Sequence, residues 1–212
     1  MLKLIGNYLS PFVRRVAVSL NALELPYELE PLFVFKEPEK VRRHNPVVRI
    51  PTLLLDDGDV VVESYAILDE IDRIVGPDRA LTPPSGKERR QVMKITAVAL
   101  ATIDKAQWAF YERRVRPPEK VHQEWIDHND RQVTGGLRWL NELASKVAED
   151  GWLVGGERLS QADISAVVAY TFANAVRPHL KLADDVPALA ALAARCEGMP
   201  VFRRAPVPES IS

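Results

Sequence analysis

Cysteine is nearly absent from this sequence: Cys196 is the only one in 212 residues. A single thiol cannot form an internal disulfide or a cysteine-based zinc site, so folds that depend on disulfides or on such a zinc site for stability are excluded. The histidines show no metal-ligand spacing and we assign them no catalytic role; they are His44, His122, His128 and His179. We therefore expect no metal site, and the lone thiol is consistent with a reducing compartment.

Long hydrophobic runs and an excess of one charge are also missing. No apolar run approaches the roughly 20 residues of a membrane-spanning helix, and the N-terminus lacks the basic and apolar segments of a signal peptide. The 28 Lys and Arg residues are balanced by 29 Asp and Glu residues. This balance creates no field over the whole chain that would attract nucleic acid. The absences together predict a cytoplasmic protein that binds neither membranes nor nucleic acids.

The first 78 residues alternate short apolar runs with helical patterns, which is typical of an α/β unit. In order, we expect a strand at 2–5, a helix after Ser10-Pro11, a strand from Tyr27, a hairpin over 51–62 that turns at Asp57-Gly58, and a helix that Ser64 caps and Gly76-Pro77 stops. The order β-α-β and then β-β-α predicts a thioredoxin-like domain over residues 1–78, followed by a linker at 79–86.

Residues 87–212 show only helical periodicity, which predicts an all-α domain. Within its second long helix, the pair Gly135-Gly136 lowers helical propensity by about 1 kcal/mol per glycine. We interpret this pair as a place where another helix packs closely. Further on, Ser160 and Asp163 have the spacing of a helix capping box, and the last helix places Cys196 on its apolar face, as an inert core thiol.

One hydroxyl stands where the first strand turns into the first helix. Ser10 precedes Pro11 there, a combination that starts helices. The unpaired N–H groups and the dipole at a helix N-terminus favour an anion. A hydroxyl at this point can donate a hydrogen bond to a bound thiolate and so lower the pKa of that thiol from its usual value of about 8.5. The alternative is that Ser10 is an ordinary helix cap.

Two further segments have the chemistry of a peptide site. If the Ile50-Pro51 bond is cis, the Ile50 backbone can pair with an extended peptide as an added strand. At the next helix start, Ser64 with its neighbouring N–H groups can hold a carboxylate, and Glu63 can hold the ammonium of the same amino acid. Each segment alone is explained by a strand-opening proline or a helix cap. The three segments in this order are far more specific.

This set of residues resembles the glutathione transferase family, and the letters SPFVRR are similar to its bacterial serine-type branch. The resemblance covers essentially the whole chain and implies a thioredoxin-like N-terminal domain, an all-α helical bundle behind it and a homodimer. It implies that glutathione is the co-substrate, and the implied site is Ser10 for the thiolate, Ile50 and Pro51 for the cysteinyl backbone, and Glu63 and Ser64 for the γ-glutamyl end. Arg49 stands where the family often has Gln or Lys near the glycyl end.

Tyr8 is a rival to Ser10, because other branches of this family use a tyrosine near the end of the same strand. We favour Ser10 because it caps the helix and precedes Pro11. The small electrophile that would accept the sulfur is expected in an apolar pocket, and its candidate lining is Tyr8, Phe12, Trp108 and Tyr111.

The expected activity is transfer of an alkyl or aryl group to glutathione, a detoxification reaction. The alternatives are a glutathione-dependent reductase, lyase, isomerase or peroxidase on the same site, and a non-catalytic interaction protein with the same fold. The sequence lacks the Ser-Ser-Cys-Ser pattern of the maleylacetoacetate isomerase branch, which argues against that isomerase. The motif also has no cysteine nucleophile, which argues against glutaredoxin-like disulfide exchange.

Overall fold

The computed structural model describes residues 1–148 and 150–207. The chain forms two compact units, of which the first is Met1–Pro84 together with the segment from Gly198 onward, and the second is Ser85–Glu197. This division differs from the expected one in two ways. Residues 79–84 belong to the first unit instead of forming a separate linker, and the C-terminal segment joins the first unit instead of the helical one.

The first unit is built on a four-stranded sheet in the order β2-β1-β3-β4. The strands are β1 (Leu2–Ile5), β2 (Tyr27–Glu30), β3 (Thr52–Leu54) and β4 (Val60–Val62). β1 pairs parallel with β2 and antiparallel with β3, and β3 forms an antiparallel hairpin with β4. The expected first strand, second strand and hairpin are confirmed, and the mixed sheet is that of a thioredoxin-like domain.

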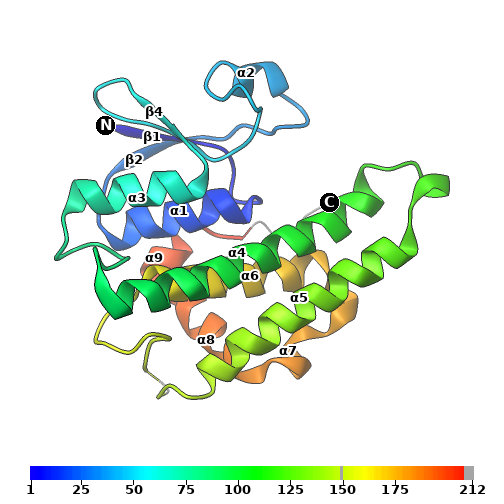
Figure 1. The fold of residues 1–212 in the computed structure, drawn as a ribbon. Helices are drawn as coiled ribbons and strands as arrows, with labels where there is room; N and C mark the ends of the chain where they lie inside the picture. Colours follow the sequence, from blue (N-terminus) through cyan, green and yellow to red (C-terminus); the bar gives the residue numbers. More distant parts are fainter. Residues whose placement is uncertain (149, 208–212) are drawn as a thin grey trace. The chain divides into compact units, whose positions relative to one another are not determined.

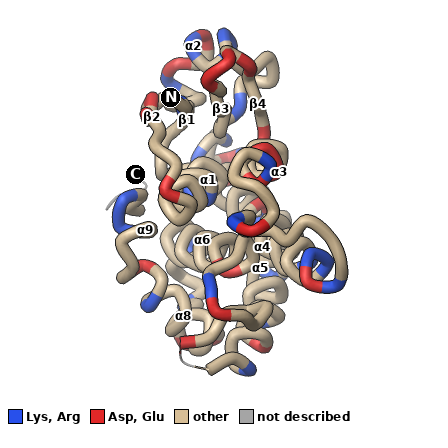
Figure 2. The backbone as a smooth tube through the Cα atoms, turned by 90° about the vertical axis from the view of Figure 1, so that its left-hand side faces the viewer, with Lys and Arg blue, Asp and Glu red and all other residues tan. Residues whose placement is uncertain are grey.

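Helices cover both faces of this sheet. They are α1 (Pro11–Ala22), α2 (Pro38–Arg42) and α3 (Ser64–Val75), and a further helix, α9 (Pro200–Arg203), packs on α1. α1 and α3 lie together on one face and α2 lies on the other (Figures 1 and 2). Successive residues of β1 point to opposite faces, and Ile5 packs with Leu32 and with Val41 of α2. α2 could not be predicted from the sequence, because its five residues are too few to show a helical period.

The C-terminal segment is held by hydrogen bonds to α1. Arg14 donates from Nε to the carbonyl oxygen of Ala205 at 2.9 Å, and Asn21 donates from Nδ2 to the carbonyl oxygen of Val201 at 2.9 Å. The Arg14 guanidinium also lies 5.8 Å from the centre of the Phe202 ring, a cation–π distance. These contacts explain why the segment belongs to the first unit.

The second unit consists of helices among its described residues. They are α4 (Gly86–Arg114), α5 (Gln123–Ala144), α6 (Gln161–Val176), α7 (Leu182–Asp185) and α8 (Pro187–Glu197), with short 3-10 turns at Pro118–Lys120 and Pro178–Leu180. α6 is buried along most of its length and packs against α4 and α8. Its capping box is confirmed, because the Ser160 N–H and hydroxyl both donate to Asp163 Oδ2, at 2.9 and 2.6 Å.

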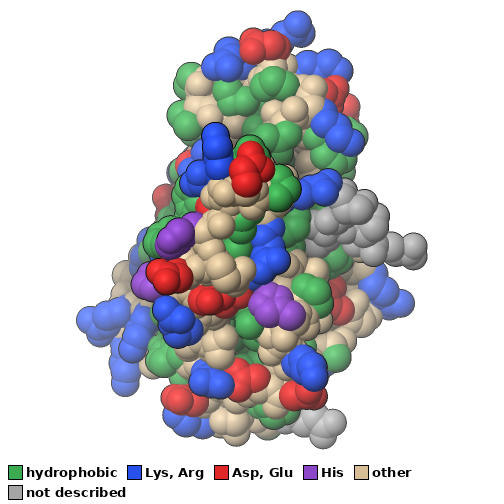
Figure 3. Space-filling model, turned by 90° about the vertical axis from the view of Figure 1, so that its right-hand side faces the viewer, with side chains coloured by type: hydrophobic (Ala, Val, Ile, Leu, Met, Phe, Trp, Pro, Cys, Tyr) green, Lys and Arg blue, Asp and Glu red, His purple; other side chains and the backbone are tan. Residues whose placement is uncertain are grey.

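Charges of both signs are mixed on one face of the molecule. On the face drawn in Figure 3, acidic and basic side chains are interspersed with apolar ones. Within the described residues, no helix combines the length and apolar character needed to cross a bilayer.

Candidate functional site

The register of the sheet brings the three predicted segments to one end of the first unit. Ile5 of β1 pairs with Thr52 of β3, and Thr52 pairs with Val62 of β4. The residues after β1, before β3 and after β4 therefore meet at this end. They are the segments 6–10, 50–51 and 63–64, which contain the sequence-predicted site residues Ser10, Ile50, Pro51, Glu63 and Ser64.

Ser10 is the N-cap of α1, as predicted. Its backbone is extended, with φ −75° and ψ 118°, and Pro11 is the first helical residue. The Ser10 hydroxyl oxygen accepts a long hydrogen bond of 3.4 Å from the Val13 N–H. This bond uses an acceptor lone pair, so the hydroxyl can still donate its proton to a ligand. The side chain is partly exposed, which leaves it accessible at the start of the helix.

The loop that carries Ser10 is fixed by Asn7, which the sequence analysis missed. The Asn7 amide donates to the carbonyl oxygen of Leu32 at 2.7 Å and its Oδ1 accepts from the Leu9 N–H at 3.2 Å. Gly6 precedes it with a φ of 137°, and an added Cβ there would collide with Val13. A buried Asn beside a glycine in a strand-to-helix turn is the local signal that could have found this anchor.

Tyr8 is directed to a different partner. Its hydroxyl lies 2.9 Å from the hydroxyl of Tyr27 on β2. Burial, and then the hydrogen bond with Tyr8, raise the pKa of Tyr27 above its ordinary value, so this phenol stays protonated at neutral pH. Either hydroxyl of this pair can be the donor, so the choice of Ser10 over Tyr8 as the hydroxyl for a thiolate stays a prediction.

The Ile50-Pro51 peptide bond is cis. A cis bond here was the requirement for pairing the Ile50 backbone with an extended peptide. The preceding loop is held by Asn45, only 2% exposed, whose amide donates to the carbonyl oxygen of Arg49 at 3.0 Å and whose Oδ1 accepts from the Val47 N–H at 3.0 Å. Ile50 is also close to the turn after β1, since an added Cβ on Gly6 would lie 3.1 Å from Ile50 Cβ. The cis loop thus lies beside the segment that leads to Ser10.

Glu63 and Ser64 begin α3, with one correction. Glu63 is the N-cap, with a φ of 69°, and Ser64 is the first helical residue instead of the capping residue that we expected. The Ser64 side chain does not cap the helix. Its hydroxyl oxygen instead accepts a hydrogen bond of 3.0 Å from Arg15 Nη1. A non-glycine residue at positive φ is uncommon and often marks a functional position.

Arg49 lies next to Glu63. Its Nη1 atom is 3.3 Å from Glu63 Oε1, and both side chains are about half exposed, at 51% and 52%. The resemblance assigned these two residues to opposite ends of the tripeptide, whereas the structure pairs them. An exposed ion pair of this kind contributes about 0–1 kcal/mol, so a charged ligand can easily replace one partner.

The four expected acceptor-pocket residues are divided between the two units. Tyr8 and Phe12 belong to the first unit, and Trp108 and Tyr111 belong to α4 of the second. Trp108 is 56% exposed, and the Tyr111 ring centre lies 5.8 Å from that of Phe110. The acceptor pocket stays a prediction.

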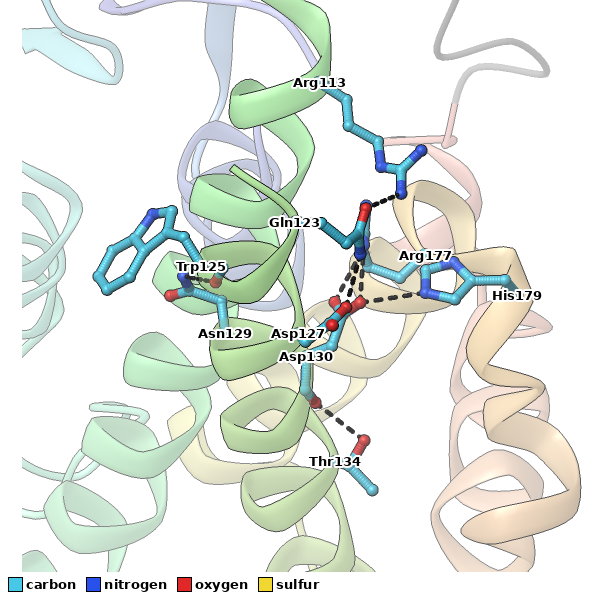
Figure 4. A network of polar contacts seen from close by, with 9 residues as sticks. All are labelled: Arg113, Gln123, Trp125, Asp127, Asn129, Asp130, Thr134, Arg177 and His179. Carbon is cyan, nitrogen blue, oxygen red and sulfur yellow. Dashed lines mark hydrogen bonds and ion pairs between the residues drawn. The ribbon is translucent and has the colours of Figure 1, made fainter. Parts of the chain in front are cut away.

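Two other titratable features lie in the second unit. Cys196 is fully buried, and burial raises the pKa of its thiol to about 12, so it is neither ionised nor accessible as a nucleophile. Asp130 of α5 binds Arg177 through two hydrogen bonds and lies 3.0 Å from His179 Nε2 (Figure 4). Among the described residues, no group of three or more His, Cys, Asp or Glu side chains is arranged to hold a metal.

Known proteins match this chain over both units. The model of the glutathione S-transferase N-terminal domain matches residues 4–79, and that of the C-terminal domain matches residues 123–195. A curated relative, probable maleylacetoacetate isomerase 2 of Drosophila melanogaster, is 29% identical over 196 residues, which are 90% of this chain and 81% of that protein.

Solved structures agree with this match. A glutathione S-transferase from Methylobacterium radiotolerans in complex with glutathione sulfonate has a TM-score of 0.89 and 28% identity, and covers 100% of this chain and 97% of its own. A glutathione S-transferase from Methylobacillus flagellatus with bound glutathione has a TM-score of 0.88 and 27% identity, over 97% of this chain and 98% of its own. Two domain models in the expected order, with the fold and register described above, lead to one conclusion: the chain belongs to the glutathione S-transferase family.

Proposed function

We propose that this protein is a glutathione S-transferase of the serine type, which joins the sulfur of glutathione to a small electrophile. The observation that carries the proposal is the convergence of the Ser10 hydroxyl, the cis Ile50-Pro51 loop and the buried Ser64 hydroxyl at one end of the sheet. The structural relatives that bind glutathione or its sulfonate support the same ligand here.

In this proposal each group has one task. Glutathione lies along the cis-proline loop, and the Ile50 backbone pairs with its cysteinyl residue. Ser10 donates its hydroxyl proton in a hydrogen bond to the sulfur, and the N-terminus of α1 adds its positive potential, so the bound thiol ionises near neutral pH. The thiolate then attacks the electrophile, which loses its leaving group or accepts a proton. Tyr8, Phe12, Trp108 and Tyr111 are proposed for the acceptor side.

A glutathione-dependent isomerase is the second candidate, because the Drosophila relative carries that name and aligns with most of the chain. In such a reaction the thiolate would add to a cis double bond, the resulting single bond would rotate, and elimination would restore the thiolate. The same Ser10 and helix terminus would serve this chemistry. Unlike conjugation, isomerisation consumes no glutathione.

The counting of thiols separates the two candidates. Calorimetry first tests whether the purified protein binds glutathione, and lack of binding contradicts both. The protein is then incubated with glutathione and either aryl halides or maleylacetoacetate, and free thiol is titrated against product formed. A transferase loses one thiol per product, whereas an isomerase forms product with no loss of thiol.

We also propose that the protein acts as a homodimer in the cytoplasm, as the family resemblance implies. Sedimentation equilibrium tests the first point: a mass near twice the 23.8 kDa of one chain is expected, and a monomer at micromolar concentration contradicts it.

A further inference from the structure

A buried cation lies directly behind the Ser64 hydroxyl. Arg15 is on α1, five residues after Ser10, and its side chain is among the largest that are fully enclosed, with 1% of the residue exposed. Its Nη1 atom donates to Ser64 Oγ at 3.0 Å, and Ser64 itself is only 3% exposed. The contact joins the helix that begins at Ser10 to the helix that begins at Ser64.

The direction of this hydrogen bond fixes what the serine can do. A guanidinium has five donors and no acceptor, so Ser64 must accept. One lone pair of the hydroxyl is then used, and its proton remains to be donated to a ligand. A charge-assisted bond to the oxygen polarises the O–H group and makes it a better donor. Arg15 therefore prepares Ser64 as a donor to an anion at the N-terminus of α3.

Electrostatics favours an anion at the same place. Burial lowers the pKa of Arg15 to about 9, because the enclosed guanidinium has lost the hydration that stabilises its charge. A carboxylate hydrogen-bonded to Ser64 would lie one hydroxyl away from this guanidinium, and the attraction between the two charges would favour its binding. The first N–H groups of α3 point to the same ligand and add a positive potential.

We propose that Arg15 is a positioning residue for the carboxylate of the γ-glutamyl end of glutathione, acting through Ser64. This inference rests on the proposed binding of glutathione and adds a charge source that is not part of the exposed site. Arg15 contributes to binding and orientation of the tripeptide at its amino-acid end. It does not take part in ionising the sulfur, which is the role of Ser10.

Arg14 offers a matched control. It is the neighbouring residue on the same helix and is equally buried, at 2% exposed. Its side chain turns to the C-terminal segment, where Nε donates to the carbonyl oxygen of Ala205. Replacement of either arginine removes one buried cation from α1, but it is Arg15 whose guanidinium donates to Ser64.

The test measures binding of two ligands by calorimetry. One is glutathione, and the other is the analogue in which the γ-glutamyl α-carboxylate is converted to an amide. We expect Arg15→Met to weaken glutathione binding about tenfold or more, the usual effect of losing a charge-assisted hydrogen bond, and to leave binding of the amide analogue within about twofold. Arg15→Lys keeps the charge and should recover part of the loss. Arg14→Met should bind both ligands like the unmodified protein.

Each result has a distinct meaning. If the unmodified protein takes up no glutathione, the proposed function fails and this inference fails with it. If it binds glutathione and both Arg15 variants bind equally well, only the role of Arg15 is overturned. Equal losses for glutathione and the amide analogue would make Arg15 merely structural. A double variant with Ser64→Ala provides a further check, because Arg15→Lys should add little loss once Ser64 is gone.

Discussion

At the scale of single residues, two hydroxyls near the start of α1 have different surroundings. Tyr8 is paired with Tyr27, whereas the bond that the structure gives the Ser10 oxygen within residues 1–148 and 150–207 is the long one from Val13. A side chain that keeps its proton for a ligand can stabilise a thiolate, and a phenol that donates to another phenol must first give up that bond.

Ser10→Ala tests this difference. A shift of about two units in the pKa of the bound thiol, from about 8.5 to about 6.5, corresponds to roughly 2.7 kcal/mol, so loss of the hydroxyl should lower the ionised fraction of the thiol, and with it kcat, by about 25-fold at pH 7. The loss should shrink as pH rises, because the thiol then ionises without help. The measurements are the pH profile of kcat and the ultraviolet absorbance of bound thiolate.

Tyr8→Phe is the control for Ser10→Ala. It removes the Tyr8–Tyr27 contact and should leave the pH profile unchanged. Equal profiles for Ser10→Ala and the unmodified protein would assign the activation of the thiol to another group.

Local pattern was enough to predict that Ser10 caps a helix and to single out Ile50-Pro51 as a candidate cis bond, because a cap and a proline act on their immediate neighbours. Local pattern could not identify Arg15, since the sequence of an amphipathic helix does not show which of its polar side chains is buried. Ser64 was expected at the cap of α3, but it is the first helical residue, and its part in ligand binding stays a prediction. Glu63, with its positive φ, is the cap, and no local signal in the sequence predicts this backbone conformation.

At the scale of helices, the Gly135-Gly136 pair shows that two adjacent glycines can have opposite roles. An added Cβ on Gly136 would collide with Thr102 Oγ1 of α4, and one on Gly135 would meet nothing within 4 Å. The Thr102 hydroxyl is held in place, because it donates to the carbonyl oxygen of Val98 at 2.8 Å. The expected close approach of another helix is therefore confirmed at Gly136 alone.

The two alanine variants should change stability in opposite directions. Gly135→Ala should raise the free energy of unfolding by about 1 kcal/mol, through helix propensity. Gly136→Ala should lower it by about 1–3 kcal/mol, because Thr102 must move. Urea titration measures both, and Gly136→Ala should be less harmful in a Thr102→Ala background. Destabilisation of equal size at both positions would contradict the packing argument.

Two arginine–carboxylate pairs connect α5 to the segment after α6, and they differ in burial. Arg177 binds Asp130 at 2.8 and 2.7 Å with side chains only 4% and 10% exposed. Arg138 binds Asp185 with comparable geometry, at 3.0 and 2.8 Å, but its side chain is 62% exposed. The members of each pair are 47 residues apart in the sequence, so the two pairs close loops of equal length, and Asp130 has His179 as an additional partner at 3.0 Å.

Asp130→Asn should lower the free energy of unfolding by about 3–5 kcal/mol, because the Arg177 charge would stay buried without its counter-ion. Asp185→Asn should lower it by at most about 1 kcal/mol, as expected for an exposed pair. Thermal and urea unfolding measure both. Similar values for the two variants would show that burial does not govern these pairs. A double variant, Asp130→Leu with Arg177→Met, should recover much of the loss.

At the scale of the whole molecule, the C-terminal segment decides how the chain is divided. Phe202 of α9 is fully buried and lies against Arg14, and Asn21 receives a hydrogen bond of 3.1 Å from Arg204 through its carbonyl oxygen. Residues close to the end of the chain thus complete the unit that contains Ser10. The expected helical domain over residues 87–212 included this C-terminal segment, whereas in the structure the segment from Gly198 onward belongs to the first unit.

Phe202→Ala should lower the free energy of unfolding by about 3–5 kcal/mol, the usual result of removing a buried phenylalanine ring. Hydrogen exchange should show weaker protection of the α1 amides, since α9 packs on α1. Phe35→Ala serves as the control within the same unit, because Phe35 is 69% exposed and its loss should have little effect. Unchanged protection of the α1 amides in Phe202→Ala would contradict the packing of α9 on α1.

The sequence by itself determined the elements whose signals are local: the cap at Ser10-Pro11, the turn at Asp57-Gly58 and the capping box of Ser160 and Asp163. Each depends on neighbours within a few residues, so the local sequence is enough to predict it. Only the tertiary structure decided that Arg15 lies behind Ser64, that Asp130 holds Arg177 and that the C-terminus joins the first unit. These contacts join residues 47 or more positions apart. Such pairings depend on sheet register and helix packing, which are set by the burial of the whole core.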